Sequence, residues 1–278
     1  MHIRQIAVDR CFAVLIALWL AGTAAPAVAA WGPGKYMAQA LAEMMVAARY
    51  VSDDSDMGLD SGICLLGAYL KPGASYAVTR ELEAGVEYAL IAGGDEDCQD
   101  VDLVILDSDG GKLAEDTETT RLAVTRFKAP RKTTAVIRMT LYAAKRDAFC
   151  SFCVLRSGGY DVPVENLTKA GDRFMGLAER TAELAQKDGL FARFLAEENQ
   201  AAVFGTILTD RRGWSSITSL NLSDKPAILL AAGDTQVEDI DLQLLNSAGS
   251  VLDKDEERDA TPVILYSPHR GAKYELRV

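Results

Sequence analysis

The sequence predicts a mainly β protein with helices, built as two tandem antiparallel β-sandwich repeats of jelly-roll type, each preceded by an α-helical segment. Residues 88–139 align without a gap on residues 227–278, so that LIAGGDEDCQDVDLVILDSDGGKLAED falls on LLAAGDTQVEDIDLQLLNSAGSVLDKD. Such self-similarity is the signature of a repeated structural unit. Both copies consist of short runs rich in branched and aromatic residues between Gly, Asp, Ser and Pro turns, which is typical of sandwiches.

The N-terminus has the pattern of a secretory signal. A weakly basic start precedes the apolar run FAVLIALWLAG, which is short for a membrane span, and then APAVAA, where Ala27 and Ala29 fit the A-x-A cleavage pattern. We therefore expect residues 1–29 to be a signal peptide that is removed after Ala29 or Ala30. An uncleaved membrane anchor is the weaker alternative, and no later run is apolar enough to span a bilayer.

The first repeat is expected over residues 31–157. Its helical segment KYMAQALAEMMVAARYV places apolar residues on one face, and its strands follow as YALIAG, VDLVIL, AVTRF and TAVIRMTLY. The members of that face are Met37, Leu41, Met44, Met45 and Ala48.

Residues 158–163, with their glycines and proline, are expected to be the linker between the two domains. The second repeat follows over residues 164–278, with strands ILLAAG, IDLQLL, VILY and YELRV. Its helical segment carries an apolar face made of Leu167, Phe174, Leu177 and Leu184.

The motif AGD followed by DxDLxLL, [DN]SxG and a closing Tyr strand resembles bacterial pre-peptidase C-terminal domains. Those are small secreted β-sandwiches, usually appended to exported proteases and other extracellular enzymes. The resemblance implies a sandwich fold in each copy and a periplasmic or secreted location in a bacterium. No peptidase accompanies the modules here, and the family pattern does not require the preceding helices.

The charge balance excludes one class of partner. The formal net charge is −11 at pH 7, and an acidic surface repels phosphate backbones, so nucleic acid is not an expected partner. The same sign suits divalent cations or basic protein surfaces.

The cysteines left after signal removal all lie in the first repeat: Cys64, Cys98, Cys150 and Cys153. In an exported protein they predict two disulfides, with three connectivities open. The Cys150–Cys153 spacing also allows a redox motif, but AFCSFCVL is typical of a strand rather than of the helix start that lowers a thiol pKa. A zinc site requires all four cysteines to converge.

Acidic residues recur at matching positions of the two copies. If Asp107–Gly111 is the hairpin loop and Leu106 pairs with Lys112, Asp102 lies opposite Asp116 and Asp100 opposite Glu118. The second copy then pairs Asp241 with Asp255 and Asp239 with Glu257.

Two interpretations of these acids are open. Opposed carboxylates favour a counter-ion, and calcium takes several carboxylate and carbonyl oxygens, with Asp95 and Asp234 available to complete the shells. Alternatively, a bulge or a one-residue slip separates the acids and leaves a solvated, turn-capping face. Calcium is the one cofactor that the sequence suggests.

No catalytic constellation is apparent. After signal removal one histidine is left, His269, and neither a nucleophile turn nor a phosphate-binding loop is present. We therefore expect a non-catalytic binding protein that presents loops or sheet faces to an extracytoplasmic protein or polysaccharide. The alternatives are a structural or accessory factor for another exported protein and, less favoured, a hydrolase. Candidate aromatic residues for a carbohydrate surface are Tyr69, Tyr76, Trp214, Tyr266 and Tyr274.

Overall fold

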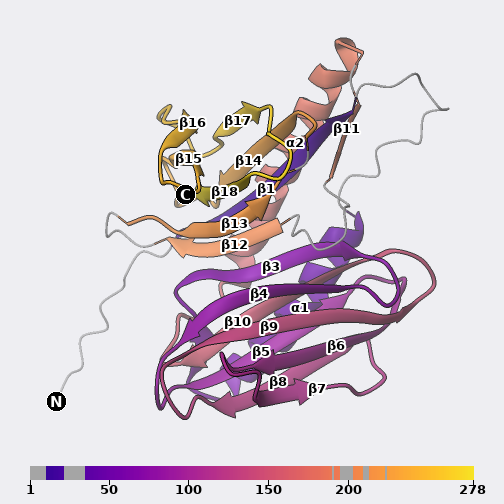
Figure 1. Ribbon diagram of the computed structural model, residues 1–278, viewed down its shortest axis with the longest axis vertical. Helices are drawn as coiled ribbons and strands as arrows, with labels where there is room; N and C mark the ends of the chain where they lie inside the picture. The colour runs from indigo at the N-terminus through magenta and orange to yellow at the C-terminus, as the bar shows by residue number, and fades with distance from the viewer. Residues whose placement is uncertain (1–10, 22–34, 190, 195–202, 209–212, 223) are drawn as a thin grey trace.

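The computed structural model describes residues 11–21, 35–189, 191–194, 203–208, 213–222 and 224–278. The described residues are mainly β, with two helices and three antiparallel sheets that form two sandwich modules, so the predicted fold class is confirmed. We call residues 35–157 the first module and residues 164–278 the second module (Figure 1).

One ten-stranded sheet runs through both modules, and we call it the shared sheet. Its order is β17-β14-β1-β12-β3-β10-β5-β8, with β2 paired to β10 and β11 paired to β1. Its first-module strands are β2 (Met57–Leu59), β3 (Gly62–Leu70), β5 (Glu87–Gly94), β8 (Leu122–Lys128) and β10 (Ala148–Ser157). The others are β1 (Cys11–Ala21), β11 (Phe191–Phe194), β12 (Val203–Leu208), β14 (Ala227–Gly233) and β17 (Val263–Tyr266).

Each module adds a four-stranded outer sheet that packs on one face of the shared sheet. The first outer sheet has the order β4-β9-β6-β7, and the second has the order β13-β18-β15-β16. The strands of the first are β4 (Ser75–Leu82), β6 (Cys98–Leu106), β7 (Lys112–Asp116) and β9 (Thr133–Ala144). Those of the second are β13 (Ser216–Asn221), β15 (Leu242–Asn246), β16 (Val251–Asp255) and β18 (Lys273–Arg277).

The helices cover the opposite face of the shared sheet. Helix α1 (Lys35–Asp53) packs on β5 and β10, and α2 (Val164–Lys187) packs on β14 and β1. The molecule therefore has two hydrophobic layers, one between the sheets and one under the helices. The shared sheet separates these layers, and its strand β14 is therefore buried along its whole length. Strand β9 of the first outer sheet instead alternates between buried and more exposed residues.

The apolar faces of the helices largely match the expectation. Helix α1 buries Met37, Met44, Met45 and Ala48, with Leu41 partly buried, as predicted. In α2 the sequence prediction was wrong for Leu184, which is 61% exposed. The buried stripe there runs through small residues, Ala170, Ala178 and Ala185, and Leu184 lies one residue, about 100° of helix, away from it.

The predicted linker, residues 158–163, is fastened to the first module. Leu59 N donates to the Tyr160 carbonyl at 2.6 Å, and Tyr160 N donates to the Leu59 carbonyl at 2.9 Å. Gly58 permits this approach, because a Cβ there would lie 2.1 Å from the Tyr160 carbonyl oxygen. Pairing of β3 with β12 then joins the modules edge to edge.

The apolar run of the predicted signal peptide forms β1, in the interior of the shared sheet between β12 and β14. Its removal stays a prediction. None of the helices that the structure describes is long and apolar enough to cross a membrane.

A candidate binding groove between the modules

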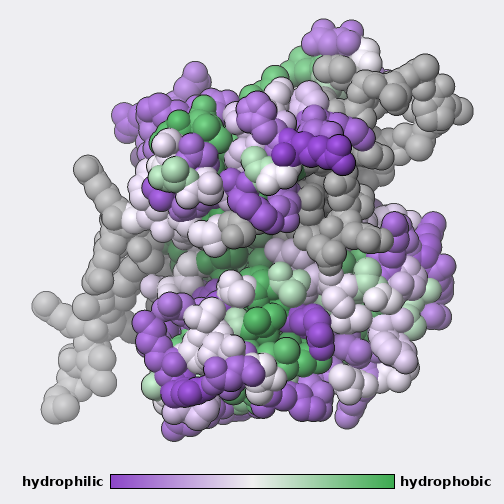
Figure 2. All heavy atoms as spheres, in the orientation of Figure 1, coloured by the Kyte–Doolittle hydropathy of each residue, from purple (hydrophilic) through white to green (hydrophobic). Residues whose placement is uncertain are grey.

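A cavity of about 650 Å³ lies where the two modules meet. Its walls come from β4 of the first outer sheet and β13 of the second, and Figure 1 shows these two strands on either side of the junction. Its floor is apolar, with Leu66 of β3, Phe152 of β10 and Phe204 of β12. Apolar surface is visible along this junction in Figure 2. We call this cavity the groove.

Both walls of the groove are open strand edges. In the part of the chain that the structure describes, β4 pairs only with β9, and β13 pairs only with β18. On the other face of the sandwich the corresponding strands β3 and β12 do pair with each other, which closes the floor. The outer sheets therefore stop at the groove, and each leaves one unpaired row of backbone N–H and C=O groups towards it.

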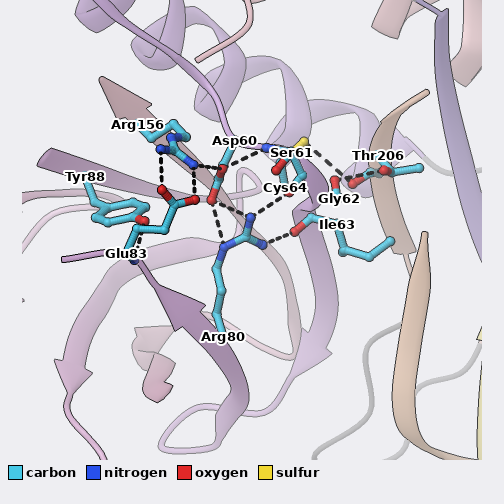
Figure 3. A network of polar contacts seen from close by, with 11 residues as sticks. Asp60, Ser61, Gly62, Ile63, Cys64, Arg80, Glu83, Tyr88, Arg156 and Thr206 are labelled. Carbon is cyan, nitrogen blue, oxygen red and sulfur yellow. Dashed lines mark hydrogen bonds and ion pairs between the residues drawn. The ribbon is translucent and has the colours of Figure 1, made fainter. Parts of the chain in front are cut away.

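The first-module wall is fixed by a buried ion pair between Arg80 of β4 and Asp60. Asp60 Oδ2 accepts hydrogen bonds from Arg80 Nε at 3.0 Å and from Nη2 at 2.5 Å (Figure 3). The side chains are only 16% and 5% exposed, respectively. Arg80 also donates to the carbonyls of Ser61 and Ile63, so its guanidinium is committed to the wall of the groove.

A second arginine extends this network. Arg156 of β10 lies 3.6 Å from Asp60 Oδ1 and donates to both carboxylate oxygens of Glu83, at 2.8 and 3.1 Å. These charge-assisted bonds lower the pKa of Glu83 and raise that of Arg156. The two arginines neutralise the two carboxylates, so the network supports the wall and leaves no net charge for a ligand.

The second-module wall is anchored through a threonine. Thr206 of β12 donates to the Gly62 carbonyl at 2.8 Å, and its hydroxyl lies 2.8 Å from the Ser215 hydroxyl. Ser215 N and the Val278 carbonyl bond at 2.8 Å, which holds the start of β13 against the end of β18. The neighbouring Trp214 lines the groove and is 46% exposed.

Two of the five candidate aromatic residues line the groove. These are Tyr76 and Trp214, and burial raises the pKa of Tyr76 to about 12. Tyr69 instead packs edge-on against Phe149, and Tyr266 packs against Tyr274.

The predicted register of the acidic hairpins was wrong by one residue. Leu106 does pair with Lys112, but a bulge between Ile105 and Leu106 then places Asp116 opposite Leu103 instead of Asp102. The second module repeats the bulge between Leu244 and Leu245, and Asp255 lies opposite Leu242 instead of Asp241. Each bulge adds one residue to one strand, which separates the acids predicted to face each other.

Several of these acids cap the backbone. Asp116 accepts from Glu118 N at 3.0 Å and from Val124 N at 2.8 Å. Asp255 repeats the pattern with Glu257 N at 3.0 Å and Val263 N at 2.8 Å. Each carboxylate thereby ties the end of one hairpin to the next strand of the shared sheet.

Asp95 and Asp234 also bind backbone, with one difference between the modules. Asp95 accepts from Asp97 N and, at 2.8 Å, from Phe149 N of β10. Asp234 accepts from Gln236 N and from the Asn166 side chain of α2. Burial raises the pKa of Asp95, and its backbone hydrogen bonds oppose that shift.

The other acids do not converge on one point in the part of the chain that the structure describes. Asp100 is buried with Oδ1 unpaired, whereas its counterpart Asp239 is exposed. Burial, with repulsion from Asp100 and Asp116, raises the pKa of Asp102, and Asp241 shows the same direction. Among the described residues no three His, Cys, Asp or Glu side chains converge as a metal would require. Calcium binding therefore stays a prediction, and no cluster of described residues supports it.

The predicted disulfides are absent: Cys64, Cys98, Cys150 and Cys153 are free, buried thiols. Cys150 and Cys153 lie three apart on β10, so they point to opposite faces, Cys150 into the sandwich and Cys153 towards the helices. Neither can reach the other, which removes the geometry of a redox motif. A hydrogen bond with the Cys150 thiol lowers the pKa of Cys98, while that bond and burial raise the pKa of Cys150.

Sequence reasoning missed the groove and its ion-pair network. One signal was available: Tyr76, Val78, Arg80 and Leu82 alternate along one face of β4, so Arg80 occupies an otherwise apolar face. A buried arginine needs a carboxylate partner. Which acid supplies it depends on a contact between separate strands, and the sequence pattern does not show that contact.

No protein-family model matches the sequence, and no curated protein matches it either. Some solved structures are similar to part of the chain. A pre-peptidase C-terminal domain of a Bacillus anthracis collagenase has a TM-score of 0.30 and 11% identity, and covers 35% of this chain and 92% of its own. A periplasmic inhibitor of g-type lysozyme from Aeromonas hydrophila has a TM-score of 0.27 and 8% identity, covering 34% of this chain and 87% of its own. No function follows from similarity at this level.

Proposed function

We propose that this protein is an exported, non-catalytic binding protein that holds an extended segment of a partner protein in the groove. The observation that carries the proposal is the pair of unpaired strand edges, β4 and β13, on the two walls of one apolar-floored cavity. Addition of a strand to an open sheet edge is a recurrent mode of peptide recognition.

The groove supplies both parts of such recognition. Backbone N–H and C=O groups of β4 and β13 give affinity for any extended chain, while the apolar floor selects side chains that point into it. The Asp60–Arg80 pair fixes the β4 wall, and the Thr206 hydroxyl fixes the start of the β13 wall, both without a ligand. A pre-formed site loses little conformational entropy when the ligand binds.

Trp214 supports a second candidate ligand, a polysaccharide. It is half exposed at the groove, together with the partly buried ring of Tyr76, and aromatic faces pack well against sugar rings. In either case the protein acts by binding, and this includes a role as an accessory factor for another exported protein.

Site-specific photo-crosslinking distinguishes these ligands. A photoreactive amino acid replaces Thr218, an exposed residue of β13 that lines the groove, and in a control replaces Tyr142, which is 67% exposed and lies outside it. After irradiation in a cell-envelope extract, mass spectrometry identifies the adducts. We expect peptide adducts at position 218 that disappear when Ala77→Trp fills the β4 wall.

Glycan adducts at position 218 would replace the peptide proposal with the polysaccharide one. Equal adducts at positions 218 and 142, or adducts that persist with Ala77→Trp, would refute binding in the groove.

A further inference from the structure

The central strand of the second module comes from outside that module. Strand β1 (Cys11–Ala21) lies between β12 and β14 and is antiparallel to both. In the first module the equivalent place, between β3 and β5, is filled by that module's own β10. We call the space between β12 and β14 the slot.

Strand β1 matches β10 partner by partner. β10 pairs with β2, β3 and β5, and β1 pairs with their second-module counterparts β11, β12 and β14. The registers agree as well. Cys150 lies opposite Gly94 as Ala13 lies opposite Gly233, which is the counterpart of Gly94 in the repeat.

The register on the other side of the slot gives the same alignment. Cys153 lies opposite Leu65, and Ile16 lies opposite Val203. Val203 is the counterpart of Leu65, because VFGTIL of β12 aligns with LLGAYL of β3. Both pairs of strands therefore place Ala13 at the position of Cys150 and Ile16 at that of Cys153. Strand β1 thus completes the second sandwich in the way that β10 completes the first.

The slot requires a particular kind of strand. In β10, residues 148–155 are all buried, because α1 covers one face of the strand and the first outer sheet covers the other. The slot has the same cover, since α2 packs on β1 and β14, and all of β14 is buried. Its occupant must be apolar on both faces instead of alternating.

The sequence, however, predicts that residues 1–29 are removed on export. Removal would leave β12 and β14 with unpaired edges in a buried, apolar setting, an arrangement that binds another strand or aggregates. We propose that the second module is a strand acceptor, whose slot takes an extended apolar segment of a partner protein, antiparallel to β12 and β14, once the N-terminal segment has left. The proposal rests on the predicted cleavage and concerns a different site from the groove.

Other ways of filling the slot fit less well. β14 could close the slot by pairing directly with β12, but β12 is already paired with β3 on its other edge. The second outer sheet has four strands like the first, so this closure would leave the shared sheet one strand short beneath it. A second copy offers β8 and β17 at the edges of its shared sheet. β8 carries Arg126 and Lys128 on its exposed face, so it is not apolar on both faces. β17 is apolar throughout, but its four residues are fewer than the seven of β14 that the occupant must cover.

The test uses β1 itself as the probe. A site for a sequence-specific protease replaces residues 24–29 of the full chain, which is purified and cut. The N-terminal fragment is removed in denaturant, and residues 30–278 are refolded with a synthetic peptide of residues 11–21 carrying Cys11→Ser. The control peptide also carries Leu15→Pro, which removes a ladder hydrogen bond at the register position of Phe152.

Amide hydrogen exchange then reports on the slot, with β5 and β10 as internal references. We expect one peptide to bind per chain and to protect β12 and β14, with loss of this protection when the control peptide is used or no peptide is added. In the uncut chain, Leu15→Pro should likewise deprotect β12 and β14 and leave β5 and β10 unchanged.

Several outcomes would overturn the proposal. Protection of β12 and β14 without peptide would mean that the slot closes on itself, and protection accompanied by dimers would mean that a second copy fills it. Failure of the peptide to protect them while β5 and β10 are protected would mean that there is no acceptor. If N-terminal sequencing shows that the exported protein retains residues 11–21, the chain's own β1 fills the slot and no partner strand can enter it. This result would leave the proposal for the groove untouched.

Discussion

The two modules share their turns and differ in their interiors. Both hairpins carry the same bulge, and Asp116 and Asp255 make the same two backbone hydrogen bonds. Within the described residues, the first module alone has the Asp60–Arg80–Arg156 network and the four thiols described above, and it supplies its own central strand. Backbone capping is thus common to the two sandwiches, whereas the buried ion-pair network and the origin of the central strand are not.

The largest expected effect comes from the buried ion pair of the first module. Asp60→Ala leaves the Arg80 guanidinium buried without its carboxylate, and we expect the free energy of unfolding of the first module to fall by about 3–5 kcal/mol. Hydrogen exchange resolved by module should show β3, β4 and β10 deprotected and β14 unaffected. The matched control is Arg126→Ala, which breaks the exposed pair with Glu87 and should change nothing measurable.

Thiol labelling gives an independent measure of the same change. Burial raises the pKa of Cys64 to about 12, so in the folded protein its thiol is both inaccessible and protonated at neutral pH. In a Cys11→Ser background, iodoacetamide should label the remaining cysteines only when the first module opens, and faster with Asp60→Ala. Rapid labelling of the unchanged chain would contradict the buried arrangement.

The next effect should be equal in the two modules. Asp116→Ala and Asp255→Ala each remove two backbone hydrogen bonds at partly exposed positions, and we expect each to cost about 1–2 kcal/mol. Denaturant unfolding followed by module-resolved exchange measures both. A large effect in one module alone would show that the repeated cap is not equivalent in the two sandwiches.

The smallest effect has the opposite sign. Burial and neighbouring carboxylates raise the pKa of Asp102 and Asp241 in the folded protein, so ionising these groups destabilises it and stability is lost as pH rises through the folded pKa. We expect Asp102→Asn and Asp241→Asn each to stabilise the protein by about 0.5 kcal/mol at neutral pH. The gain should vanish in acid, below the ordinary Asp pKa of 3.8.

The same variants test the calcium hypothesis. If calcium bound these carboxylates, adding it after a chelator would raise the melting temperature, and Asp102→Asn with Asp241→Asn would abolish that rise. Stabilisation by the two substitutions with no response to calcium would instead identify repelling acids on a solvated face.

Local chemistry made the turns and faces predictable. Gly110 and Gly249 adopt positive φ in hairpin turns where Asp107 and Asn246 accept backbone hydrogen bonds, and both turns could be inferred from the aligned repeat. The bulges could not, because the extra residue is accommodated by twist between paired strands and leaves no mark on the alternation of Val101, Leu103 and Ile105. Four of the candidate acids, Asp95, Asp116, Asp234 and Asp255, accept backbone hydrogen bonds, and the pairing predicted for the hairpin acids was wrong.

The sequence by itself determined the duplication, the sandwich modules, the helices before them and the apolar faces, because these depend on periodicity and on neighbours a few residues apart. Only the tertiary structure decided that β3 pairs with β12 to make one sheet, that Arg80 meets Asp60, and that Cys11–Ala21 takes the place of β10. Those contacts join segments far apart in the chain, and several strands of similar apolar composition satisfy the same pattern. The choice among them is made by which arrangement buries every apolar face and pairs every buried charge at once.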